Sequence, residues 1–186
     1  MRVLGVDPGL RLTGYGCIQV RGLDCDLVEA GVIRLTIRAE NKGAASVSAR
    51  LAELDRDFRA MLERLAPDVV AVESIFAHYK HPATAIVMGH ARGVLLLAIR
   101  AAGIDLIELK PNAVKKSLTG HGHADKGAMQ RAIQTRFALD TPPKPPDVAD
   151  ALAIALCAAT RGAGTPNGAR RSKRLTSAEV ARSLGA

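Results

Sequence analysis

Tryptophan is absent from this chain, and aromatic residues make up only 3% of it. A core must therefore be built from Leu, Val, Ile and Ala, and a hydrophobic fraction of 48% is ordinary for a globular protein. Cysteine is scarce as well: Cys17, Cys25 and Cys157 are odd in number and show no CxxC spacing. This pattern argues against a disulfide framework or a thiolate metal site, and it favours reduced thiols in a cytoplasm.

Long uncharged apolar runs are also missing. The longest apolar stretch, around residues 87–102, contains His90, Arg92 and Arg100, and we expect it to be too short and too charged to span a membrane. The N-terminus runs directly into strand-like sequence, so we expect no signal peptide. These absences favour a cytoplasmic protein of one domain, with no membrane as a partner.

Positive charge is in excess and unevenly distributed. The net charge is +8, which makes a modest case for a polyanionic partner. From Arg161 onward there are six Lys/Arg residues and a single acidic residue, Glu179. We predict one domain over residues 1–160 and a basic, disordered tail over 161–186. A solvated tail would by itself account for the charge there.

The hydrophobic pattern changes period along the chain. Alternating or β-branched apolar runs predict strands, and apolar residues at spacings of three and four predict helices. The strands are expected at 3–7, 14–20, 27–35, 69–73 and 105–109, and the helices at 47–65, 82–102, 112–118, 125–138 and 147–160. This order predicts an α/β protein with a mixed sheet of about five strands, three antiparallel and two parallel, flanked by helices.

The expected helix at 82–102 is unusual because its apolar residues lie nearly all round it. A helix of this kind is buried on several sides. It is either a central core helix or a subunit interface, and the pattern does not decide between them.

Two acidic residues end apolar strands. Asp7 follows "VLGV" and Glu73 follows "VVAV". Either residue alone is most simply a turn or loop residue, since a strand end meets water. If the two strands are parallel neighbours, however, both carboxylates emerge at the same edge of the sheet, where ligand sites of α/β sheets lie.

A second acidic pair occurs in "PPDVADALAIA". Asp147 and Asp150 are three residues apart at a helix start, so they share one face. Helix capping accounts well for Asp147 and less well for Asp150, which has apolar neighbours. Four converging carboxylates without cysteine ligands select a hard cation such as Mg²⁺, and two such ions about 4 Å apart act together on a phosphodiester.

The stretches "GVDPGLRLTGYG", "VAVESIF", "GHARGV" and "DVADALAIA" resemble, in order and spacing, the motifs of the RuvC family. Its members are crossover junction endodeoxyribonucleases, or Holliday junction resolvases, with a ribonuclease-H-like fold. The resemblance covers roughly residues 1–160. It implies a homodimer of recombination and repair that binds four-way DNA junctions, works with a branch-migration motor complex, and nicks two strands of like polarity with Mg²⁺. Such nicks leave 5′-phosphate and 3′-hydroxyl ends.

By the same resemblance, the catalytic and metal-binding residues are Asp7, Glu73, Asp147 and Asp150. Two Mg²⁺ ions per site are expected, with Mn²⁺ a possible substitute. Four further residues are implied as DNA contacts: Phe76, Tyr79, Lys115 and Lys126. Phe76 and Tyr79 would stack on bases, although a core role is the alternative for Phe76, and surface solvation is the alternative for the lysines. His121 and His123 have no matching position, and exposure in a loop is their simplest interpretation.

Three other functions would account for part of this sequence. An RNA-processing nuclease of the same superfamily shares the fold but fits the four motifs less closely. A kinase or ATPase of the actin-like kind also has a "DPG" turn after a strand, but it needs two such domains, and this chain is too short. A non-enzymatic DNA architectural protein explains the charge and leaves the acids at two strand ends unexplained.

Overall fold

The computed structural model of the chain describes residues 1–35, 44–74 and 82–162. Within them the strands are β1 (Arg2–Asp7), β2 (Leu12–Arg21), β3 (Asp24–Arg34), β4 (Val69–Glu73) and β5 (Asp105–Leu109). The helices are α1 (Ala44–Leu65), α2 (Pro82–Ala101), α3 (Pro111–Thr119), α4 (Lys126–Arg136) and α5 (Pro146–Gly162). The predicted order of elements is confirmed, with β2 and β3 each extending beyond the expected range.

The five strands form one mixed sheet in the order β3-β2-β1-β4-β5. β1, β2 and β3 are antiparallel neighbours, joined between β2 and β3 by a turn in which Gly22 has a φ of 62°. β4 and β5 run parallel to β1 because helices connect them. The predicted α/β architecture is therefore confirmed, including three antiparallel and two parallel strands.

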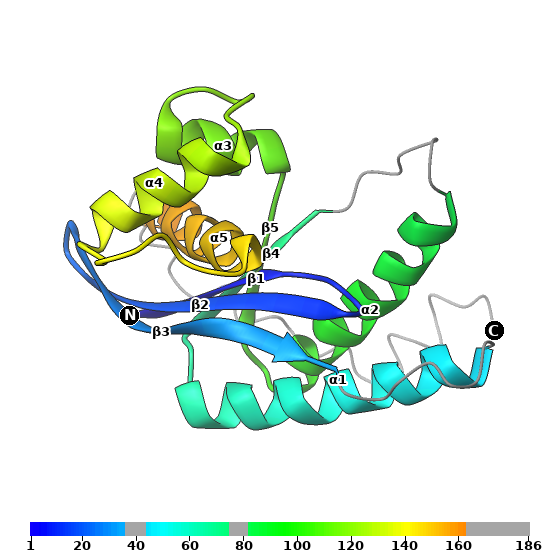
Figure 1. Cartoon of the computed structure of the whole chain (residues 1–186). Coiled ribbons are helices and arrows are strands. Elements are labelled where there is room, and N and C mark those ends of the chain that lie inside the picture. The colour runs from blue at the N-terminus through cyan, green and yellow to red at the C-terminus, as the bar shows by residue number, and fades with distance from the viewer. Residues whose placement is uncertain (36–43, 75–81, 163–186) are drawn as a thin grey trace, which may run out of the picture.

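Helices cover both faces of this sheet (Figure 1). α5, α3 and α4 lie on one face, and α1 and α2 on the other. Side chains alternate between two cores along each strand: Val3 and Ala71 pack with α5, whereas Leu4, Val6 and Val70 pack with α1 and α2. A residue's place in this alternation decides which layer its side chain meets.

The packing of α5 against the sheet is very close, because the strands present glycines to it. A Cβ atom at Gly5 would lie 2.1 Å from the carbonyl oxygen of Ala151, and one at Gly16 would lie 2.6 Å from a methyl carbon of Leu152. Neither position could carry a side chain without moving the helix. The run from Val148 to Ala159 is buried throughout, except for Asp150, so α5 is the central helix of the protein.

α2 differs from the expected helix in one respect. By length and composition the stretch Ala83–Ala101 is apolar enough to cross a membrane, and only 22% of it is buried. The expectation that this stretch is too short and too charged is thus wrong on those criteria, although a single such helix is weak evidence for a membrane. Ala91, Leu95, Ala98 and Ile99 are buried against the second core. The opposite side is exposed.

Candidate active site

The register of the central strands brings two acidic side chains together. β1 and β4 are parallel and pair Val6 with Val72, so the next residues, Asp7 and Glu73, follow at the same level of the sheet. Val6 and Val72 belong to the core under α1 and α2. Alternation therefore turns Asp7 and Glu73 to the face that α5 covers.

α5 supplies the other two carboxylates from its first turns, and Gly14 explains how they come so near. Gly14 is the cross-strand partner of Asp7. A Cβ atom at Gly14 would lie 2.2 Å from the carbonyl oxygen of Asp147. The absence of a side chain there lets the start of α5 lie directly beside Asp7, and Asp150 follows on the same face of the helix.

These surroundings raise the pKa of Asp7. It is raised from 3.8 to about 8, first by burial and then by the charges of Glu73, Asp150 and Asp147, while Lys126 opposes the shift. A largely buried carboxylate surrounded by others holds its proton, because little water reaches its charge and one lysine compensates it only in part.

Glu73 and Asp150 respond to the same surroundings. Burial, followed by the charge of Asp150, raises the pKa of Glu73 from 4.5 to about 7. Burial also raises the pKa of Asp150, and Asp147 adds to that shift. The four predicted carboxylates thus form one electrostatic cluster, called here the acidic cluster: Asp7, Glu73, Asp147 and Asp150.

The predicted lysines lie beside the acidic cluster. Lys126, in the first turn of α4, lowers the pKa of both Asp7 and Asp150. Lys115, on α3, lowers that of Glu73 and of Asp150. The two lysines come from different helices and approach from the same side. A phosphate at this edge of the sheet would therefore lie near both the positive lysines and the negative carboxylates.

The acidic cluster has the donors that a hard divalent cation prefers, namely carboxylate oxygens without thiolate or imidazole. Across the described ranges, however, no three acidic, histidine or cysteine side chains stand close enough together to hold one ion. Binding a cation therefore requires the carboxyl groups to approach one another.

One positioning contact was not predicted from the sequence. Arg92 of α2 donates a hydrogen bond from Nε to the backbone carbonyl of Glu73, at 3.3 Å, and pairs through Nη2 with Glu108 of β5. Its side chain is only 19% exposed. Arg92 therefore ties α2 to the ends of two parallel strands, next to the acidic cluster. An arginine within a largely apolar helix was the sequence feature that could have indicated this contact.

The remaining predicted residues are distributed differently. Phe76 and Tyr79 lie outside the described residues. His121 and His123 are exposed in the turn between α3 and α4, and the His121 ring nitrogen Nδ1 lies 3.2 Å from the carbonyl oxygen of Thr119. Neither histidine belongs to a group that could hold a metal ion within the part of the chain that the structure describes.

The family model described as crossover junction endodeoxyribonuclease RuvC matches residues 3–158. This chain belongs to the RuvC family. A RuvC from Rhodopirellula baltica is 42% identical over 155 residues, which cover 83% of this chain and 84% of that relative. The expected family is thereby confirmed, and with it an endodeoxyribonuclease that depends on a divalent metal ion.

Solved structures agree with this assignment. Thermus thermophilus RuvC, in complex with a Holliday junction substrate, superposes with a TM-score of 0.76 at 32% identity, covering 88% of this chain and 96% of that one. A yeast mitochondrial Holliday junction resolvase shares the fold at 17% identity with a TM-score of 0.62, covering 84% and 78%. The ribonuclease-H-like resolvase fold is thus confirmed.

Proposed function

We propose that this RuvC-family chain resolves four-way DNA junctions by nicking two strands of like polarity. The observation that carries the proposal is the acidic cluster, in which parallel strand ends and α5 bring four carboxylates to one edge of the sheet. Its place in a family of crossover junction endodeoxyribonucleases supports the same reaction.

We infer that Asp7, Glu73, Asp147 and Asp150 hold the divalent ions, with two Mg²⁺ per site and Mn²⁺ as a possible substitute. When bound, such ions supply a nucleophile from water at neutral pH and neutralise charge on the phosphate. The carboxylates would hold these ions beside the reacting phosphate. The products are a 5′-phosphate and a 3′-hydroxyl.

Lys115 and Lys126 have a twofold role in this proposal. They hold phosphates of the cut strand, since both lie at the edge of the acidic cluster. They also favour the ionised form of the carboxylates and so oppose part of the upward pKa shift, because a nearby ammonium group stabilises the charged form. Phe76 and Tyr79 remain candidates for stacking on bases at the junction, on the resemblance alone.

A homodimer through α2 completes the proposal. Ile86 is 60% exposed and Leu97 is 65% exposed. Gly89 and Gly93 lie between them at helical spacing, with open space over each. This stripe is apolar and flat, so a second α2 can approach it closely. Two sites related by a twofold axis would meet two strands of like polarity.

The wider setting is inferred from the family. We place the enzyme in the cytoplasm, in recombination and repair, with a branch-migration motor complex as its partner. The nuclease domain is inferred to be residues 1–160, and residues 161–186 a basic tail that adds phosphate contacts.

Cleavage of a mobile four-way junction tests the function directly. The junction is incubated with and without Mg²⁺, beside linear duplex and RNA–DNA hybrid of the same sequence. We expect paired nicks in opposed arms of the junction only, with Mg²⁺ required, and we expect DNA ligase to reseal them. Cutting of the hybrid in preference to the junction would favour an RNA-processing enzyme instead.

A further inference from the structure

A cavity of about 590 Å³ opens beside the acidic cluster, and neither the metal site nor the lysines account for it. The turn from Asp7 to Leu12 forms one wall, and the first two turns of α2 form the wall opposite. Arg50 of α1 and Asp147 of α5 complete the lining. Two members of the acidic cluster, Asp7 and Asp147, therefore belong to the wall of this cavity.

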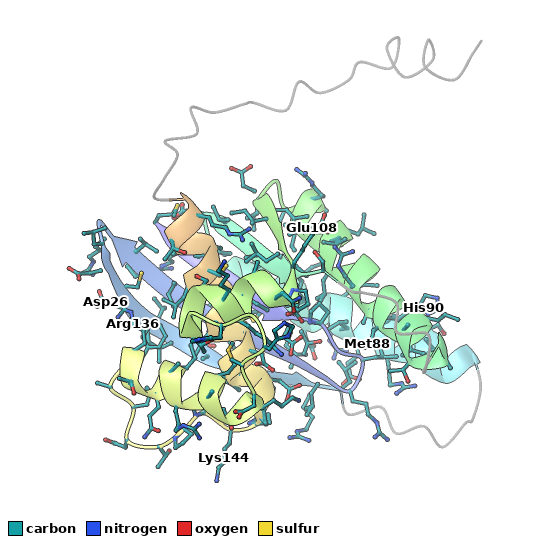
Figure 2. All side chains as sticks on the ribbon, turned by 90° about the horizontal axis from the view of Figure 1, so that it is seen from above. Asp26, Met88, His90, Glu108, Arg136 and Lys144 are labelled. Carbon is teal, nitrogen blue, oxygen red and sulfur yellow. The ribbon has the colours of Figure 1, made fainter. Side chains whose placement is uncertain are left out.

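The walls combine apolar surface with positive charge. Leu10, Val87 and Met88 provide the apolar part, while Arg11 and Arg50 provide two guanidinium groups. Figure 2 shows Met88 on α2, across the molecule from Arg136 of α4. Among the described residues, the lining of the cavity does not include Lys115 or Lys126, whose helices α3 and α4 lie on the opposite face of the sheet from α2.

This chemistry matches one component of the substrate better than the others. A phosphate alone would not need the apolar walls, and a duplex is too wide to enter. A single unstacked base has two apolar faces and carries a phosphate on each side. Apolar side chains and guanidinium planes both stack on bases, and arginine also binds phosphate.

We infer that this cavity binds one unstacked nucleobase of the strand being cut, with an adjoining phosphate held by Arg11. The inference rests on the proposed function, since it needs a DNA strand at Asp7 and Asp147. Because these two residues line both sites, the base is the one next to the scissile phosphodiester. Extracting it costs least at the branch point, where stacking is already interrupted.

Filling the cavity tests this inference. Thr84 lines it from α2 and is exposed, so Thr84→Trp fills the space without disturbing the core. Thr135→Trp is the matched control, at an exposed position of α4 outside the cavity. Single-turnover cleavage is measured for each protein on an intact junction and on junctions that lack one base at a time around the cut. Circular dichroism and light scattering confirm that each variant is a folded dimer.

With the wild type, we expect one abasic junction to be cut about tenfold more slowly, the loss typical of one stacked base. Thr84→Trp should cut the intact junction more slowly by a similar factor, and the missing base should then make no further difference. Thr135→Trp should behave as the wild type. Equal effects of every missing base on Thr84→Trp and on the wild type would overturn the base site while leaving the proposed function intact.

The phosphate contact has a test of its own. Arg11→Gln should lower the slope of binding affinity against salt concentration by about one, because one phosphate contact is lost. Arg21→Gln, an exposed arginine at the far end of β2, is the control and should leave the slope unchanged. An unchanged slope for Arg11→Gln would remove Arg11 from the site. Absence of any junction cleavage by the wild type would instead overturn the proposed function.

Discussion

The two faces of the sheet hold their helices in different ways. α5 is pressed onto Gly5, Gly14 and Gly16 so closely that an added Cβ atom would overlap it. α2 packs through one side only, and Ile86 and Leu97 on its other side are open to solvent. The first face places carboxylates by rigid contact within one chain. The second leaves a helix that a partner can complete, while Arg92 keeps it attached to Glu73.

Among the variants that test this comparison, the largest effect is expected from breaking the close contact of α5. Gly14→Ala places a Cβ atom 2.2 Å from the Asp147 carbonyl oxygen, so the start of α5 must move. We expect nicking to fall about 100-fold, as for a displacement of about 1 Å in an active site. The free energy of unfolding should fall by about 1–3 kcal/mol, as for an overpacked core. Single-turnover kinetics and urea denaturation measure both.

Gly122→Ala is the control for this substitution. Its Cβ atom would lie 3.5 Å from the carbonyl oxygen of Asn112, an ordinary contact. We expect both quantities to stay near the wild type. If Gly14→Ala nicks junctions as fast as Gly122→Ala, the glycine contact does not position Asp147.

Arg92→Gln tests the attachment of the other face. The variant loses the guanidinium that contacts both the Glu73 carbonyl and Glu108. We expect kcat to fall about 10- to 100-fold, as when a supporting contact of a metal ligand is lost. Junction affinity should not change, which separates a positioning role from DNA binding.

Glu108→Gln provides the comparison for Arg92. It weakens the ion pair and leaves the contact between Arg92 and the Glu73 carbonyl in place. We expect a smaller loss of kcat than for Arg92→Gln. Equal losses would mean that the pair with Glu108, and not the contact with Glu73, is what matters.

Leu97→Glu should separate the proposed dimer into monomers that remain folded. A carboxylate on the exposed stripe of α2 would face its own copy across the twofold axis. Light scattering should give the monomer mass, and the free energy of unfolding of that monomer should change by no more than about 0.5 kcal/mol. Leu23→Glu, at a leucine 95% exposed in the β2–β3 turn, is the control and should stay dimeric. A dimeric Leu97→Glu protein would place the interface elsewhere.

The last prediction concerns pH in metal-free protein and involves stability alone. Asp7 and Glu73 have pKa values of about 8 and about 7 when folded, against ordinary values of 3.8 and 4.5. The folded state therefore binds more protons than the unfolded state between these limits, so stability falls as pH rises from about 4 to about 8. Asp7→Asn removes much of this dependence. Melting temperatures measured with a chelator should converge at low pH and favour the variant near pH 8.

The acidic residues were predictable because their signal is local. Asp7 and Glu73 each end an apolar strand, and the alternation of strands with helices implied that those strands run parallel. Asp147 and Asp150 share a helix face by spacing alone. The fold followed from the same periodicities, with differences only at the ends of strands and helices, such as β3 and α4.

Contacts between distant elements were harder to predict. The sequence did not indicate that Gly14 and Gly16 adjoin α5, since a glycine in a strand does not show which element packs against it. α2 is apolar nearly all round, so its sequence did not distinguish Leu96, which packs against the core, from exposed Leu97. Arg92 counted as a charge against membrane insertion, and its contact with Glu73 became visible only with the fold.

The central claim is that the acidic cluster carries out the cleavage and is not needed for recognition. Asp7→Asn tests it most directly, on one synthetic four-way junction, with a band-shift assay for binding and a nicking assay in Mg²⁺. The account predicts that the variant binds the junction as the wild type does and makes no nicks. Unimpaired nicking by Asp7→Asn would contradict it.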